Sequence, residues 1–158
     1  MPSATPAEVL AQRRHLILNR DIGGFVDLFA PDAVIEGPFT GPPGTSMRLE
    51  GREAIREYSR RVMASPLRLE DFEVVELYQT QDPEVVIVEM RTTATVTTTG
   101  ESFTATSIQI LRIREGQIVL FRDFADSRVL EDVIRNRARK PDPAGNAWST
   151  ETTEGPRS

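Results

Sequence analysis

The side chains that most often carry out enzyme chemistry are scarce in this chain. It has no cysteine, which excludes thiolate nucleophiles, disulfide scaffolds, iron–sulfur clusters and cysteine-based zinc sites. Its one histidine, His15, cannot form a metal site with a second histidine of the same chain, and a Ser-His-Asp triad would have to use that single ring. His15 lies between Arg14 and Leu16, and we expect it to be a surface or partly buried helix residue rather than a catalyst. The chemistry that remains is that of carboxylates, tyrosine or arginine, or none.

Helices are predicted at the start of the chain. Thr5, Pro6 and Glu8 have the spacing of a helix start, with Thr5 as the N-cap and the helix ending near Asn19. The apolar spacing over 22–29 predicts a second, short helix.

A break in regular structure is predicted between a short strand at 33–36 and a third helix at 51–64. The segment 37–51 contains four glycines and three prolines, so we expect a loop with no regular element. Loops of this length are often entrances to a site, although a plain surface excursion is about as common.

The second half of the chain is predicted to be sheet. Hydrophobic residues alternate from Arg68 onward, and Thr, Val and Ile become the commonest residue types. The connections are as short as hairpins, so consecutive strands should be antiparallel neighbours. Strands are expected at 69–79, 85–98, 102–114 and 117–125, followed by a short helix over 129–138 and a disordered tail over 139–158.

These elements predict an α+β fold in which the helices cover one concave face of a long, strongly curved antiparallel sheet. The domain is expected to span 1–138. Strand 102–114 is apolar on both faces, with Ile108 and Ile110 opposite Leu111 and Ile113. A sheet that is covered by helices on one side and apolar on the other often buries the second side in another subunit, so we predict a homodimer.

Composition limits the partners. The 158 residues, 39% hydrophobic and 27% charged, are typical of one compact domain. A formal net charge of -5 gives nucleic acid or an anionic membrane little to attract. The longest apolar runs, such as 85–88, are far shorter than the roughly 20 residues that span a bilayer. The N-terminus does not look like a signal peptide. We therefore expect a cytoplasmic protein with a neutral or small-molecule partner, and neither nucleic acid nor membrane.

The order of the elements and two segments carry a resemblance to a known superfamily. The segments are FAPDAVIEGP at 29–38 and GREAI at 51–55, with a proline-rich loop between them. Over roughly 7–137 the chain resembles the nuclear transport factor 2-like superfamily, and within it the SnoaL-like polyketide cyclases and ketosteroid isomerase. The segment RDFADS at 122–127 is similar to that of limonene-1,2-epoxide hydrolase and the phenazine biosynthesis A/B proteins. The resemblance implies a cone-shaped pocket between the helices and the sheet.

The ketosteroid isomerase site does not carry over. The position of its general-base Asp is Gly37, its oxyanion Asp falls at Gln109, and its oxyanion Tyr falls near Arg13. Steroid isomerisation by that mechanism is therefore not expected.

The comparison with the two enzyme types leaves one acidic group, Asp123. Of the Asp-Arg-Asp trio of the epoxide hydrolase only the last residue is matched, by Asp123, while the other two positions are Met90 and Thr92. Asp123 resembles the catalytic carboxylate of the SnoaL-like cyclases, where a lone Asp shuttles a proton at an acidic carbon. Gln109, Thr92 or Tyr58 could hold the developing enolate oxygen.

The resemblance also sets which strand residues point inward, and it predicts an apolar cavity with a single carboxylate. Burial should raise the pKa of Asp123 and suit it to general acid/base work near neutral pH. The structural alternative is that Asp123 pairs with Arg122, Arg91 or Arg128 and only stabilises the strand end. The residues expected to contact substrate are Phe25, Phe29, Ile35, Tyr58, Val88, Met90, Thr92, Gln109 and Phe121.

The sequence thus favours an acid/base enzyme, without metal or other cofactor, that closes or isomerises a ring in a hydrophobic polyketide-type metabolite. An enzyme that opens or closes an oxygen ring, as an epoxide hydrolase does, stays open. So does a non-catalytic protein that holds a hydrophobic metabolite in the same cavity. A third alternative is a dimerisation module whose pocket is filled by its own side chains.

Overall fold

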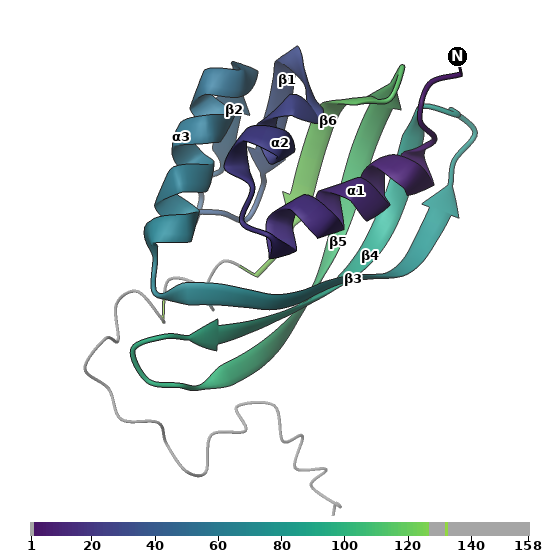
Figure 1. Cartoon of the computed structure of the whole chain (residues 1–158). Helices are drawn as coiled ribbons and strands as arrows, with labels where there is room; N and C mark the ends of the chain where they lie inside the picture. Colours follow the sequence, from purple (N-terminus) through teal and green to yellow (C-terminus); the bar gives the residue numbers. More distant parts are fainter. Residues whose placement is uncertain (1, 127–131, 133–158) are drawn as a thin grey trace, which may run out of the picture.

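A computed structural model describes residues 2–126 and 132, and the segment 2–126 forms three helices and six strands (Figure 1). The helix predicted over 129–138 and the tail over 139–158 lie outside these residues, apart from residue 132. No helix in the described part is long and apolar enough to cross a membrane. In chain order the elements are α1 (Pro6–Leu18), α2 (Ile22–Asp27), β1 (Phe29–Gly37), β2 (Met47–Glu50), α3 (Gly51–Ala64), β3 (Leu67–Gln79), β4 (Val85–Val96), β5 (Ser102–Arg114) and β6 (Gln117–Phe124).

The strands form one sheet in the order β2-β1-β6-β5-β4-β3. Strands β3 to β6 are consecutive antiparallel neighbours, as their short connections predict. The expectation of a purely antiparallel sheet is wrong, because β1 pairs with β6 in parallel and brings Ile35 opposite Phe121. The chain can make this pairing because β2, α3 and the other three long strands lie between β1 and β6 and form the crossover.

The expectation that 37–51 contains no regular element is also wrong. Met47–Glu50 forms β2, which is antiparallel to β1 with Gly37 opposite Met47. The glycines and prolines of the segment lie at 37–44 and at 51, so the four residues of β2 contain no breaker and are free to pair. Strand β1 is also longer than predicted, and α2 ends at Asp27.

The start of α1 is formed as the sequence predicts. The Glu8 backbone N–H donates to Thr5 Oγ1 at 3.2 Å, and the Thr5 N–H donates to Glu8 Oε2 at 2.7 Å, which completes a capping box. Helix α1 packs against β3 and α3 against β1, and all three helices lie on the same face of the sheet (Figure 1). The site described below lies between these helices and the sheet.

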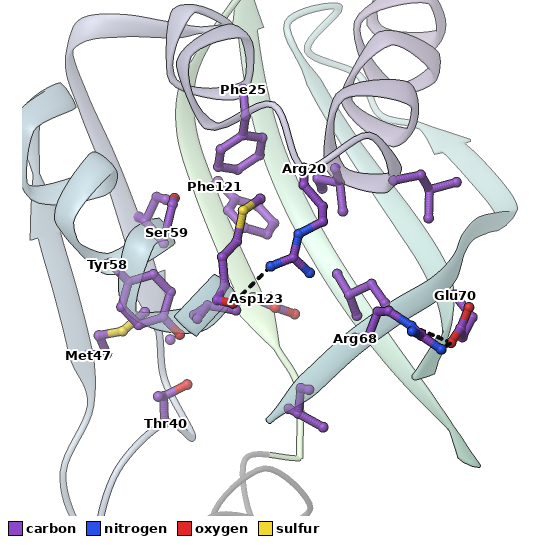
Figure 2. A pocket seen from close by; sticks show the side chains of 18 residues that line it. Arg20, Phe25, Thr40, Met47, Tyr58, Ser59, Arg68, Glu70, Phe121 and Asp123 are labelled. Atoms are coloured by element: carbon purple, nitrogen blue, oxygen red, sulfur yellow. Dashed lines mark hydrogen bonds and ion pairs between the residues drawn. The ribbon is translucent and has the colours of Figure 1, made fainter. Parts of the chain in front are cut away.

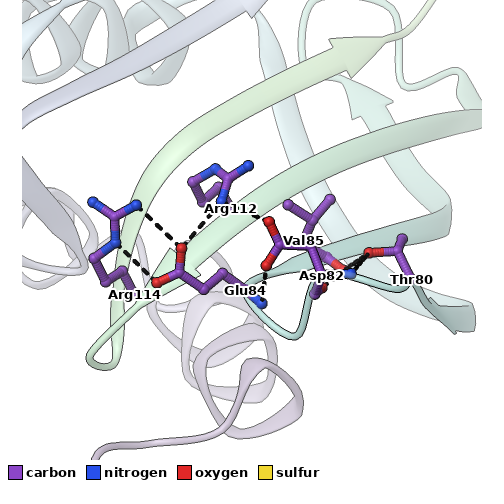
Figure 3. A network of polar contacts seen from close by, with 6 residues as sticks. All are labelled: Thr80, Asp82, Glu84, Val85, Arg112 and Arg114. Carbon is purple, nitrogen blue, oxygen red and sulfur yellow. Dashed lines mark hydrogen bonds and ion pairs between the residues drawn. The ribbon is translucent and has the colours of Figure 1, made fainter.

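An ion-pair network attaches the β3–β4 turn to β5 (Figure 3). Glu84 accepts hydrogen bonds from Arg112 at 3.0 Å and from Arg114 at 2.9 Å, and Asp82 accepts one from Arg112 at 3.0 Å. These arginines hold the pKa of Glu84 below its usual range. The pKa of Asp82 is also lowered, mainly by the hydrogen bond from the Glu84 backbone N–H and in addition by Arg112. Both carboxylates are paired and partly exposed, so the network fixes the position of the turn against β5 and offers no reactive group.

Candidate active site

A cavity of about 410 Å³ lies beside α3, between the α1–α2 turn and the sheet (Figure 2). Residues from α1, α2, α3, β1, β2, β3 and β6 line it, and most of their side chains are apolar. The charged side chains in the lining are Arg20, Arg68, Glu70 and Asp123. The volume falls within the range of small-molecule sites, so the pocket is not filled by the protein's own side chains.

Asp123 lies in the wall of this cavity, on β6, with Gln109 of β5 as its cross-strand neighbour. Its Oδ1 atom is buried and has no hydrogen-bond partner. Burial raises the pKa of Asp123 from 3.8 to about 6, against the opposing effects of the Arg13 charge and of hydrogen bonding by Gln109. A carboxyl group with such a pKa is present in both protonation states near neutral pH, as a general acid/base requires.

Two of the three arginines that the structural alternative pairs with Asp123 are engaged elsewhere. Arg122 Nε lies 2.8 Å from Glu36 Oε2, and Arg91 pairs with a glutamate of β3 at 3.7 Å. Arg128 lies outside the described residues.

The cation that does act on Asp123 is Arg13 of α1, whose side chain is only 1% exposed. Its Nη2 donates to Gln109 Oε1 at 2.8 Å, and the guanidinium lies over the rings of Phe72 (4.9 Å) and Phe121 (5.3 Å). Burial lowers the pKa of Arg13 to about 10, and the Asp123 charge opposes this. Arg13 is therefore still protonated at neutral pH, although its Nε and Nη1 atoms have no hydrogen-bond partner.

These three residues form a polar unit within an apolar core. Gln109 Oε1 accepts from Arg13, so the amide nitrogen of Gln109 is the atom that can donate toward Asp123. Arg13 and Asp123 make no direct hydrogen bond. The positive charge thus moderates the pKa of Asp123 through space without occupying the carboxyl group.

The sequence pattern that defines the SnoaL-like domain matches residues 12–121. The chain belongs to the SnoaL-like domain family. A PhzA/B-like protein of Pseudomonas aeruginosa, itself uncharacterized, is 38% identical over 117 residues, which is 74% of this chain and 81% of the relative.

Two solved structures illustrate the fold of this SnoaL-like protein. A proposed isomerase from Bacillus subtilis is 28% identical, with a TM-score of 0.72 over 80% of this chain and 90% of that one. SalBIII, an epoxide hydrolase/cyclase-like enzyme with a role in pyran ring formation in the polyether salinomycin, is 24% identical, with a TM-score of 0.61 over 75% and 88% of the chains. At this lower identity the likeness to SalBIII is one of fold alone.

The structure divides the residues expected at the site into two groups. Phe25, Ile35, Tyr58, Phe121 and Asp123 line the cavity. The others lie outside its lining: Phe29, Val88, Met90 and Gln109 are buried in the core, and Thr92 is half-buried on β4.

Helix α1 explains why the inward side chains of β4 lie away from the cavity. Met90 Sδ is 3.7 Å from Arg13 Nη2, so this part of β4 packs under α1 rather than beside a ligand space. Among the cavity residues, Tyr58 of α3 has its pKa raised by burial and by the Asp123 charge, so its hydroxyl stays protonated. Among the described residues, no group of three or more acidic or histidine side chains could hold a metal ion.

Arg13 is a residue of the site to which the sequence analysis gives no role, although it places Arg13 near the position of the oxyanion Tyr of ketosteroid isomerase. It also gives no role to Arg20, Arg68 and Glu70 of the cavity lining. Arg13 lies four residues from Val9, and three and four residues before Leu16 and Ile17, so it shares the apolar face of α1. A charged residue inside an apolar helical stripe is the signal that could have identified it. His15, by contrast, is exposed as expected.

Proposed function

We propose that this SnoaL-like protein is a cofactor-independent acid/base enzyme that closes or isomerises a ring in a hydrophobic polyketide-type metabolite. The observation that carries the proposal is the position of Asp123, a carboxyl group with a raised pKa in the wall of a largely apolar cavity. Burial of this carboxyl group disfavours its charged form, and such perturbed groups cluster at functional sites.

In the proposed reaction, ionised Asp123 takes a proton from an acidic carbon of the substrate and returns it to another atom. The proton balance is closed within one turnover, so no other reactant is needed for an isomerisation. The Tyr58 hydroxyl, which remains protonated and lines the same cavity, can donate a hydrogen bond to the developing enolate oxygen. Arg13 and Gln109 are positioning residues that hold and tune Asp123 from behind the cavity wall.

Two findings support a ring chemistry. The chain belongs to the SnoaL-like family, and SalBIII, which shares its fold, has a role in forming a pyran ring. In its protonated form Asp123 could also donate a proton to an epoxide oxygen of the substrate while a hydroxyl of the same molecule attacks the epoxide carbon. The epoxide C–O bond breaks, the C–O bond of the new ring forms, and the attacking hydroxyl returns its proton to Asp123.

We further propose that two copies of the chain associate through the sheet face opposite the helices. Ile108 of β5 is 40% exposed and neighbours buried Gln109, so its side chain points away from the Arg13 side of the sheet. Tyr78 and Val75 of β3 are also exposed. The wild type should elute as a dimer in light-scattering chromatography, and Ile108→Glu as a monomer. A monomeric wild type would contradict this proposal.

The catalytic proposal is tested by the Asp123→Asn variant with a panel of polyketide-type substrates. Turnover should fall by about 10²-fold or more while ligand binding is kept, because the variant removes the proton carrier and little volume. Asp32→Asn is the matched control, since Asp32 is exposed on β1 away from the cavity lining. Equal turnover in Asp123→Asn and wild type would refute the proposed acid/base catalysis and favour a non-catalytic binding protein. Carboxyl-carbon NMR, assigned with the same variant, should give Asp123 a pKa near 6.

A further inference from the structure

Arg20 occupies a backbone position that ordinarily favours glycine. It follows the end of α1 with φ at 58°, in the left-handed region. The Arg20 N–H donates to Ile17 O at 3.0 Å and the Asp21 N–H donates to Leu16 O at 2.9 Å, the two bonds of a Schellman motif. A residue with a Cβ is strained at this position, and such strain is a reason to look for a role of the side chain.

The Arg20 side chain is part of the cavity lining. Its Nη2 donates to Met63 O at 3.0 Å, near the end of α3, so the side chain extends from the α1–α2 turn toward that helix (Figure 2). This anchor holds the guanidinium in place while the residue remains exposed overall. The remaining donors of the guanidinium are available to a ligand.

Of the two arginines in the lining, Arg20 is the one that has no protein counter-ion in the described part of the chain. Arg68 pairs with Glu70 at 2.9 Å, and the charge that lowers the pKa of Asp123 is that of Arg13. Arg20 makes no ion pair with any described carboxylate and is held by a carbonyl oxygen alone. A guanidinium fixed at the edge of an apolar cavity, with donors that no protein acceptor uses, favours an anion there.

We propose that Arg20 binds the acidic group of the ligand, so that the cavity accepts an amphipathic organic acid with an apolar body and one carboxylate or similar anion. This inference rests on the proposed function in so far as the ligand is the substrate of Asp123. Guanidinium binds a planar carboxylate with two parallel hydrogen bonds, which would fix the orientation of the apolar body within the cavity.

The test compares two fluorescent probes with the same ring system. 1-Anilinonaphthalene-8-sulfonate carries an acidic group and N-phenyl-1-naphthylamine does not. Arg20→Gly should lower the affinity for the anionic probe about tenfold or more, the usual effect of losing a charge-assisted hydrogen bond. The affinity for the neutral probe should change less than about twofold. The unfolding midpoint of Arg20→Gly should be equal to or above that of the wild type, because glycine suits the left-handed position.

Two controls separate this inference from its alternatives. Arg20→Asn should lose affinity for the anionic probe in the same way, since asparagine also tolerates the left-handed backbone. Arg14→Gln should keep that affinity, because Arg14 pairs with Asp71 outside the cavity. Equal weakening of both probes, or no binding of the anionic probe to the wild type, would overturn the inference. If Asp123→Asn keeps full turnover while Arg20→Gly still loses the anionic probe, the proposed catalysis fails and the inference about the ligand holds.

Discussion

Replacing Asp123 by asparagine should stabilise the protein above pH 6, although it removes the proposed catalytic group. Ionised Asp123 is disfavoured by burial, which raises its pKa from 3.8 to about 6 in the folded chain. A difference of this size corresponds to about 3 kcal/mol of unfolding free energy, an upper value because the side chain is partly exposed. Asparagine resembles the protonated form in size and carries no charge, so it avoids this cost.

The sign of the effect follows from the direction of the pKa change. A carboxyl group whose pKa is raised on folding contributes its full stability below the unfolded pKa, near 4, and this stability is lost as pH rises through the folded value. The wild type and Asp123→Asn should therefore have similar stability near pH 4. The variant should become progressively more stable than the wild type up to about pH 7, and the difference should then level off.

The assay is urea unfolding of both proteins at steps between pH 4 and pH 8. Carboxylates with arginine partners, such as Glu36 and Glu84, have lowered pKa values, so their effect on stability lies at more acidic pH and is common to both proteins. Asp32→Asn, measured alongside, is the matched control for replacing an exposed aspartate away from the cavity lining. An Asp123→Asn variant that is less stable than the wild type at pH 8, or whose difference is independent of pH, would refute the assignment of Asp123 as a desolvated carboxyl group.

Three further outcomes are expected. Arg13→Met should raise the pKa of Asp123 above 6 in the carboxyl-carbon NMR titration, because it removes the charge that lowers it, and an unchanged or lower value would count against the electrostatic role of Arg13. Thr5→Ala should cost about 1 kcal/mol in urea unfolding by breaking the capping box, with unchanged binding of the neutral probe, whereas no loss would mean that the cap is not formed. Phe29→Ala should cost about 3–5 kcal/mol, since Phe29 is fully buried against Phe25, and a loss below about 1 kcal/mol would contradict this packing.

Much of the local structure follows from the sequence by itself. The N-cap at Thr5 and the strand over 102–114 form as predicted, because capping boxes and alternating β-branched residues act between near neighbours in the chain. The antiparallel order of β3 to β6 follows from the short turns that join them. Strand alternation predicts that the Asp123 side chain points inward, once the resemblance to the family shows which alternate residues of the strand face the cavity.

The rest depended on contacts between segments that are distant in the chain. The parallel pairing of β1 with β6 brings together residues such as Ile35 and Phe121, and no local pattern specifies it. Whether Arg13 is buried depends on how α1 lies over β3 and β4 and on Gln109, which is 96 positions further along. Composition and alternation therefore led to the carboxyl group, but the cation that tunes it was placed only by tertiary packing, because the free energy of a charge is set by the atoms around it in space.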